Sequence, residues 1–196
     1  PTSGKPLTVG PALVGRIIAG RYEIRGILGE GGMGAVYEAI HLDIGRRVAL
    51  KRLHPELATD QSAVTRFHRE ARAAGSTGHE NVVDVLDLGY AEDGAPYLVL
   101  ELLEGETLAA RLAHEPQLSA SRTARIGGQV LAALQAVHAK GVIHRDLKPE
   151  NIFLTRRSGR ADFVKVLDFG VSKIATGDGE ESSLTRTGVT VGTPQY

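Results

Sequence analysis

The stretch that most limits how this chain can fold is a glycine-rich segment between two strand-like runs. Gly29, Gly31 and Gly34 follow the spacing G-x-G-x-x-G, with strand-like sequence over 21–28 before them and over 35–40 after them. In a dinucleotide-binding fold such a segment opens a helix, whereas the β-branched and aromatic residues after Gly34 favour a strand. We therefore predict a β-hairpin whose glycine tip can approach phosphates and donate backbone N–H groups to them. An ordinary glycine-rich hairpin is the alternative.

A second segment, residues 142–151, is rich in chemically active groups. Within six positions it holds the carboxylate of Asp146, the ammonium of Lys148 and the carboxamide of Asn151. Pro149 prevents a regular helix there. These groups are suited to accepting a hydroxyl proton, neutralising a phosphate and holding a divalent metal.

The same segment matches the pattern H-R-D-L-x-x-x-N and resembles the catalytic loop of protein kinases. The resemblance implies that Asp146 accepts the proton of the substrate hydroxyl and that Lys148 neutralises the transferring phosphoryl group. It also implies that Asn151 ligates a metal and that His144 packs in the core instead of acting as a base. The sequence Lys-Pro-Glu that begins at Lys148 is typical of serine/threonine kinases. The sequence of the glycine-rich segment is similar to that of bacterial serine/threonine kinases.

Other working parts of a kinase follow in the expected order. Lys51 ends a predicted strand over 47–51, and Glu70 lies on a predicted helix over 59–74. The resemblance makes them an ion pair that aims the lysine at the ATP phosphates. A solvated surface glutamate is the alternative for Glu70. Asp168 begins Asp-Phe-Gly after a short predicted strand, and the resemblance makes it the second metal ligand.

The resemblance also implies an adenine pocket. Backbone groups of Glu101 and Leu103 would bond the edge of the base, and Leu100 would lie behind it. The alternative is that these are plain core residues, since such pockets use core-type side chains. The apolar side chains that would enclose the base are Leu28, Val36, Ala49 and Phe153.

The predicted fold class is α+β. We expect a small lobe with a five-stranded antiparallel sheet and one helix over 21–100, and a hinge over 101–104. The last two strands of this sheet are predicted over 82–86 and 96–101. The first part of a mainly helical large lobe should follow over 105–196. Its longest predicted helix covers 119–140 and ends at Gly141. The apolar side of this helix is predicted to consist of Ile126, Val130, Leu131, Leu134 and Val137. Residues 1–20 are rich in proline and glycine and predict a flexible leader, with order beginning near Arg21.

Composition adds limits on partners and compartment. Lys plus Arg and Asp plus Glu number 23 each among 196 residues, which gives no overall attraction to nucleic acid. The absence of cysteine excludes disulfides and thiolate chemistry. No apolar run is long enough to span a membrane and no signal peptide is present, so we expect a cytoplasmic protein. The expected ligands are ATP with Mg²⁺, or with Mn²⁺ in its place, and proteins with Ser or Thr acceptors.

The polar stretch 177–187 predicts a mobile activation loop. Arg145 lies beside the expected base, where an unpaired guanidinium is costly, and a loop phosphate could pair with it. By resemblance we expect autophosphorylation at Thr185 and Thr187, with a kinase dimer as the reacting species. The alternative is two solvated loop threonines. Thr193 is expected to bond the catalytic aspartate and lysine, as in serine/threonine kinases.

One departure from the family concerns the end of the sequence. A kinase continues beyond a segment like residues 192–196 into helices that form the floor of the large lobe, and these are absent. The apolar side of the helix over 119–140 should then face water. The alternatives to an active kinase are therefore a pseudokinase and a truncated, inactive interaction module. Loss of Lys51, Asp146 or Asp168 would mark a pseudokinase, and all three are retained.

Overall fold

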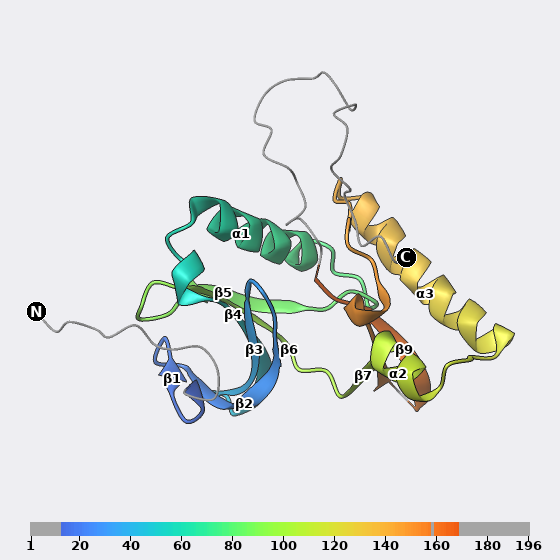
Figure 1. Cartoon of the computed structure of the whole chain (residues 1–196), viewed down its shortest axis with the longest axis horizontal. Helices are drawn as coiled ribbons and strands as arrows, with labels where there is room; N and C mark the ends of the chain where they lie inside the picture. Colours follow the sequence, from blue (N-terminus) through green and yellow to red (C-terminus); the bar gives the residue numbers. More distant parts are fainter. Residues whose placement is uncertain (1–12, 158, 169–196) are drawn as a thin grey trace, which may run out of the picture. The chain divides into compact units, whose positions relative to one another are not determined.

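The computed structural model describes residues 13–157 and 159–168 (Figure 1). These residues form two compact units. The first unit comprises residues up to 78 together with 83–104. The second comprises residues 79–82 together with those from 105 onward.

The first unit is built on an antiparallel sheet with the strand order β1-β2-β3-β4-β6-β5. The five predicted strands are all present, and β1 adds a sixth. The predicted hairpin is confirmed, because β2 pairs antiparallel with β3 and the glycine-rich segment joins them. The strands are β1 Ile17–Ile18, β2 Tyr22–Glu30, β3 Gly34–His41, β4 Arg46–Leu53, β5 Val85–Tyr90 and β6 Pro96–Glu101.

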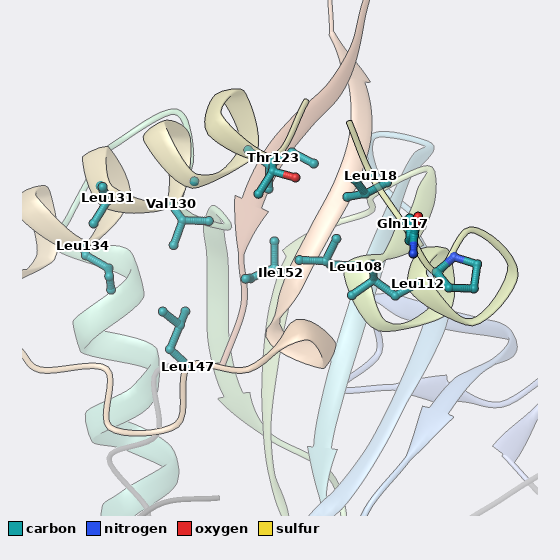
Figure 2. Close-up of a pocket in the computed structure, with 13 residues that line it drawn as sticks. Leu108, Leu112, Gln117, Leu118, Thr123, Val130, Leu131, Leu134, Leu147 and Ile152 are labelled. Carbon is teal, nitrogen blue, oxygen red and sulfur yellow. The ribbon is translucent and has the colours of Figure 1, made fainter. Parts of the chain in front are cut away.

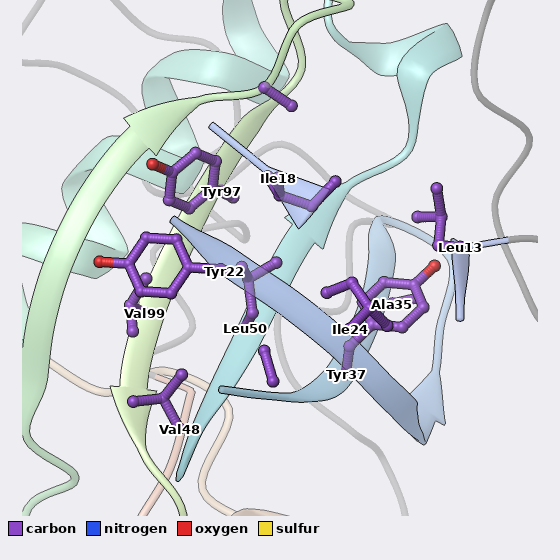
Figure 3. Packing of buried hydrophobic residues seen from close by; sticks show 12 residues of the cluster. Leu13, Ile18, Tyr22, Ile24, Ala35, Tyr37, Val48, Leu50, Tyr97 and Val99 are labelled. Carbon is purple, nitrogen blue, oxygen red and sulfur yellow. The ribbon is translucent and has the colours of Figure 1, made fainter. Parts of the chain in front are cut away.

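The residues before Arg21 correct the expectation that order begins there. Leu13 and Ile18 are fully buried, and β1 pairs with the start of β2. They pack with three tyrosine and several aliphatic side chains on one face of the sheet (Figure 3). Sequence patterns do not predict this packing, because a two-residue strand is too short to produce a periodic pattern.

Helix α1, Gln61–Gly75, confirms the helix predicted over 59–74, and its N-cap is Asp60. The Asp60 side chain accepts a hydrogen bond from the Ser62 backbone N–H, which satisfies one of the free donors of the first turn. The buried side of α1 is formed by Phe67 and four alanines. These small residues let the helix lie close to β5 and β6 of the same unit (Figure 1).

The described residues of the second unit form the α-helices α2 and α3, the short helix η3 and a three-stranded sheet of order β7-β8-β9. Helix α3, Ala120–His138, confirms the long predicted helix, with Ser119 as N-cap and Gly141 in the left-handed conformation after its end. Helix α2 and strand β7 were not predicted. The remaining elements are α2 Leu108–His114, β7 Gly105–Thr107, η3 Pro149–Asn151, β8 Ile152–Arg157 and β9 Arg160–Val166.

Residues 79–82 correct the predicted strand over 82–86. The strand of the first unit begins later, at Val85, and Val82 instead forms a parallel bridge with Val166 of β9. Asn81 binds β9 on both sides of this bridge, since its carbonyl accepts from Val166 N–H and its Nδ2 donates to the Val164 carbonyl at 2.8 Å. The Lys165 ammonium donates to the Val82 carbonyl at 3.1 Å. We call residues 79–82 the β9 strap.

The buried side of α3 differs from the predicted one at one position. Ile126, Val130, Ala133 and Val137 are buried, but Leu131 is 67 % exposed. Leu131 lines an apolar groove of about 690 Å³ between α2 and α3 (Figure 2). The expectation that apolar side chains of this helix face water therefore holds at Leu131. Within the described part of the chain, no helix combines the length and apolarity that a membrane span requires.

Candidate active site

The glycine-rich hairpin tip is held by its own backbone. Gly31 N–H donates to the Gly34 carbonyl at 2.9 Å, and Gly34 N–H donates to the Gly31 carbonyl at 3.3 Å. A Cβ atom at Gly34 would lie 2.1 Å from the Arg52 carbonyl oxygen of β4, closer than any side chain tolerates. Glycine is thus required at position 34 by strand packing, independently of any ligand.

His54 contacts this tip, although the sequence patterns did not predict a role for it. The ring Nε2 of His54 lies 2.8 Å from the Gly31 carbonyl oxygen. The signal in the sequence is its position shortly after the predicted strand over 47–51. That signal says nothing of a partner 23 residues earlier in the chain.

Lys51 and Glu70 meet within the first unit. Lys51 Nζ donates to Glu70 Oε1 at 2.6 Å, and both side chains are largely buried. Lys51 comes from β4 and Glu70 from α1, so the pair links the helix to the sheet. Such a short charge-assisted hydrogen bond fixes the lysine ammonium near the glycine-rich strands.

The residues predicted for the adenine pocket lie in both units. In the first unit Ala49 and Leu100 are buried and directly paired across β4 and β6, whereas Leu28 is 52 % exposed. Glu101 N–H donates to the Asp84 carbonyl, and its side chain accepts from Asp84 N–H at 2.9 Å. Val36 and Leu103 also belong to this unit, and Phe153 lies on β8 of the second.

The predicted catalytic loop brings its three polar side chains together. Lys148 Nζ lies 3.3 Å from Asp146 Oδ2. Asn151 Nδ2 donates to the Asp146 carbonyl at 2.8 Å and lies 3.4 Å from its Oδ2. Pro149 starts the short helix η3, which ends at Asn151 and turns the carboxamide back toward the aspartate.

His144 is buried beneath this loop, in agreement with the packing role implied for it. Its Nε2 lies 2.9 Å from the Leu167 carbonyl, and its Nδ1 accepts from Asp146 N–H at 3.3 Å. The ring therefore donates at Nε2 and accepts at Nδ1, as a neutral imidazole does. Burial lowers the pKa of His144, which favours the same neutral form.

Asp168 follows β9 with a left-handed backbone, at φ 41°. Leu167 N–H donates to the Asn151 carbonyl at 2.9 Å, so the segment that carries Asp168 is bonded to the end of the catalytic loop. A carboxylate and a carboxamide oxygen are hard ligands of the kind that Mg²⁺ prefers. Among the residues described, no group of three His, Cys, Asp or Glu side chains is arranged for a metal.

Not every predicted residue can be followed in the structure. Lys51 and Glu70 belong to one unit and Asp146, Lys148, Asn151 and Asp168 to the other. Thr185, Thr187 and Thr193 lie outside the described residues.

Comparison with known proteins identifies clear relatives. The protein kinase domain family matches residues 22–196. Serine/threonine-protein kinases pkn3 and Pkn1 of Myxococcus xanthus are 47 % and 48 % identical to the chain, over 93 % and 94 % of its length. The chain spans 34 % and 26 % of these relatives. The crystal structure of the Mycobacterium tuberculosis PknI kinase domain matches with a TM-score of 0.67 and 30 % identity, covering 80 % of this chain and 61 % of that one.

Proposed function

Because the chain belongs to the protein kinase domain family, we propose that it is part of a serine/threonine kinase that transfers the γ-phosphoryl group of ATP to proteins. The two compact units then correspond to the small lobe and the first part of the large lobe. The observation that carries the proposal is the catalytic loop, where Asp146, Lys148 and Asn151 converge within hydrogen-bonding or ion-pair distance.

Each of these residues has a role that its chemistry supports. The Asp146 carboxylate accepts the proton of the substrate hydroxyl as the phosphoryl group is transferred. The Lys148 ammonium beside it stabilises the ionised carboxylate and the negative charge on the phosphoryl oxygens. The Asn151 hydrogen bonds to Asp146 hold the base in position while leaving the carboxamide oxygen available as a ligand.

The residues predicted to bind nucleotide and metal have side chains that suit ATP and a divalent cation. Lys51, held by Glu70, and the glycine-rich hairpin would bind the phosphates, and the adenine-pocket residues would bind the base. Asn151 and Asp168 would hold Mg²⁺, or Mn²⁺ in its place, which neutralises phosphate charge when bound.

Asp146→Asn in the complete protein tests this assignment. The change removes the proton acceptor but keeps the shape of the side chain, so we expect phosphoryl transfer to fall by a factor of about 100 to 10,000. Transfer of ³²P from ATP to a protein acceptor measures it, with Lys51→Ala as a second variant. Near-normal turnover in both variants contradicts the proposal. Absence of transfer by the natural protein indicates a pseudokinase or an inactive interaction module.

The same reaction identifies the acceptor. Lys148 in its Lys-Pro-Glu setting supports transfer to Ser or Thr, and a dominant phosphotyrosine signal would contradict it.

We further propose Thr185 and Thr187 as autophosphorylation sites in a kinase dimer, Thr193 as a residue near the acceptor hydroxyl, and a cytoplasmic location. Mass spectrometry after incubation with ATP checks the two sites. Full activity with both threonines unmodified would place the regulatory switch elsewhere.

A further inference from the structure

His54 is anchored to both ends of the glycine-rich tip. Its backbone N–H donates to the Met33 carbonyl at 3.0 Å, and its ring Nε2 lies 2.8 Å from the Gly31 carbonyl oxygen. Leu53, the residue before it, is the last residue of β4 and pairs with Gly34. His54 therefore extends the contact of β4 beyond the end of the ladder, into the turn itself.

The local sequence holds His54 in this position. Pro55 follows it and restricts it to extended backbone, observed at φ −58° and ψ 137°. His54 occupies the N-cap position of the short helix η2, Pro55–Leu57, but makes no side-chain cap hydrogen bond there. Its ring is used on the glycine-rich tip instead. Because a carbonyl oxygen can only accept, the ring Nε2 must be the donor.

The Gly31 carbonyl accepts from His54 Nε2 at 2.8 Å and from Gly34 N–H at 3.3 Å, and together these two bonds determine which way one peptide group faces. The peptide between Gly31 and Gly32 is trans, so its C=O and N–H point in opposite directions. With the carbonyl bonded to His54, the Gly32 N–H faces away from His54. Both flanking residues are glycines, which allow such a peptide to rotate with little steric resistance. Rotation would place the carbonyl oxygen where the Gly32 N–H now lies.

We propose that His54 is a positioning residue for nucleotide phosphates, acting by holding the Gly31–Gly32 peptide with its N–H toward them. This inference rests on the proposed function, because it takes the glycine-rich tip to bind ATP. An N–H donor stabilises a phosphate oxygen, whereas a carbonyl in the same place repels it. His54 should thus favour the phosphate part of ATP and have no effect on the adenosine part.

The test compares the affinities of the complete protein for ATP and for adenosine, by calorimetric titration in the presence of Mg²⁺. His54→Phe keeps a ring of similar size without a donor, and His54→Gln keeps an N–H donor at a similar reach. We expect the phenylalanine variant to bind ATP about tenfold more weakly, because that factor corresponds to the free energy of one ordinary hydrogen bond. Its affinity for adenosine should be unchanged. The glutamine variant should retain most of the ATP affinity.

A matched control is His68→Phe. His68 lies on α1 of the same unit, where its ring is 3.1 Å from the Tyr90 hydroxyl. The same ring exchange there should leave ATP and adenosine affinities unchanged. Amide hydrogen exchange of Gly34, whose N–H donates to the Gly31 carbonyl, provides a second readout without nucleotide. It should be faster in His54→Phe than in His54→Gln, and equal rates in the two variants would contradict the positioning role.

The outcomes separate the two proposals. If the natural protein binds ATP and His54→Phe binds it equally well, the role of His54 is wrong and the proposed function stands. If both His54 variants lose ATP affinity equally, the N–H donor is not what matters and the inference also fails. If the natural protein binds neither ATP nor adenosine, the proposed function itself is wrong.

Discussion

At the scale of single residues, His144 is bonded in a way that only the neutral ring allows. Its Nδ1 accepts from Asp146 N–H, and its Nε2 contacts the Leu167 carbonyl. If Nδ1 carried a proton, its N–H would face the N–H of Asp146, and neither could accept a hydrogen bond. Burial also lowers the pKa of His144, because a charged ring would lose its hydration there.

This gives stability a defined dependence on pH. Below the unfolded-state pKa of about 6.5, an unfolded chain binds a proton at His144 that the folded chain does not. The free energy of unfolding should therefore fall as pH decreases from about 6.5 toward the lower folded-state pKa. His144→Gln removes this titration, so it should be less stable than the natural chain near neutral pH but lose less stability on acidification.

Urea unfolding at about pH 7.5 and about pH 5.5, on either side of the unfolded-state value, measures the difference. His138→Gln, at an exposed histidine at the end of α3, is the control for the exchange of histidine for glutamine. Equal pH dependence in the natural chain and His144→Gln would show that His144 does not titrate as described.

At the scale of elements, a buried carboxylate joins α3 to β9. Asp162 Oδ2 accepts from Arg122 Nε at 2.7 Å and Oδ1 accepts from Arg122 Nη2 at 2.8 Å, a bidentate pair. Arg125 Nη2 donates to the same carboxylate at 3.1 Å. The Arg122 guanidinium, followed by the other nearby arginines, lowers the pKa of Asp162. The aspartate has a left-handed backbone at φ 55°, which Asn also tolerates.

Asp162→Asn thus removes the charge with little backbone strain. We expect a loss of about 2–3 kcal/mol in the free energy of unfolding, below the usual range for a buried pair because Arg122 is partly exposed. The contribution of the natural pair is present above the ordinary aspartate pKa and is lost as pH falls through the lowered one. The variant should therefore be less sensitive to acid than the natural chain.

The control for this change is Glu80→Gln. Glu80 pairs with Arg157 at 3.2 Å on the surface of the same unit, with both side chains more than half exposed. Its loss should cost less than about 0.5 kcal/mol. Similar losses from Asp162→Asn and Glu80→Gln would contradict the stabilising role of the buried carboxylate.

The sequence predicted long elements better than short ones, for a physical reason. Helices α1 and α3 and the β2–β3 hairpin carry enough residues to display periodicity and end signals. The two-residue β1, the three-residue β7 and the seven-residue α2 do not. The hydrogen bonds of Asp162 and His54 also escaped prediction, because they join residues 40 and 23 positions apart through the tertiary fold. The catalytic-loop and lysine–glutamate assignments came from the family pattern, and their catalytic roles remain predictions.

At the scale of the whole molecule, the apolar groove of the second unit bears on behaviour in solution. Leu131, Leu134 and Leu147 line one part of it, and Leu108, Leu112 and Leu118 another (Figure 2). Contiguous exposed apolar surface of this kind promotes association between molecules.

Leu131→Lys is therefore expected to raise the solubility of the 196-residue chain. Because the leucine is 67 % exposed, the free energy of unfolding should change by less than about 0.5 kcal/mol. Light scattering against concentration measures association, and urea unfolding measures stability. Val130→Lys, at the buried neighbouring position, is the contrasting variant and should unfold the chain readily. A large loss of stability from Leu131→Lys would mean that this side chain is packed.

The β9 strap has a consequence for cutting the polypeptide. Residues 79–82 belong to the second unit but lie within the sequence of the first, so no single cleavage separates the units. Cleavage between Glu104 and Gly105 would leave the strap on the first fragment. The second fragment would then lose the partners of Val164 carbonyl and Val166 N–H. The first fragment would carry the matching edge, so the two pieces should rejoin by β-strand addition, as in complementation of a split protein.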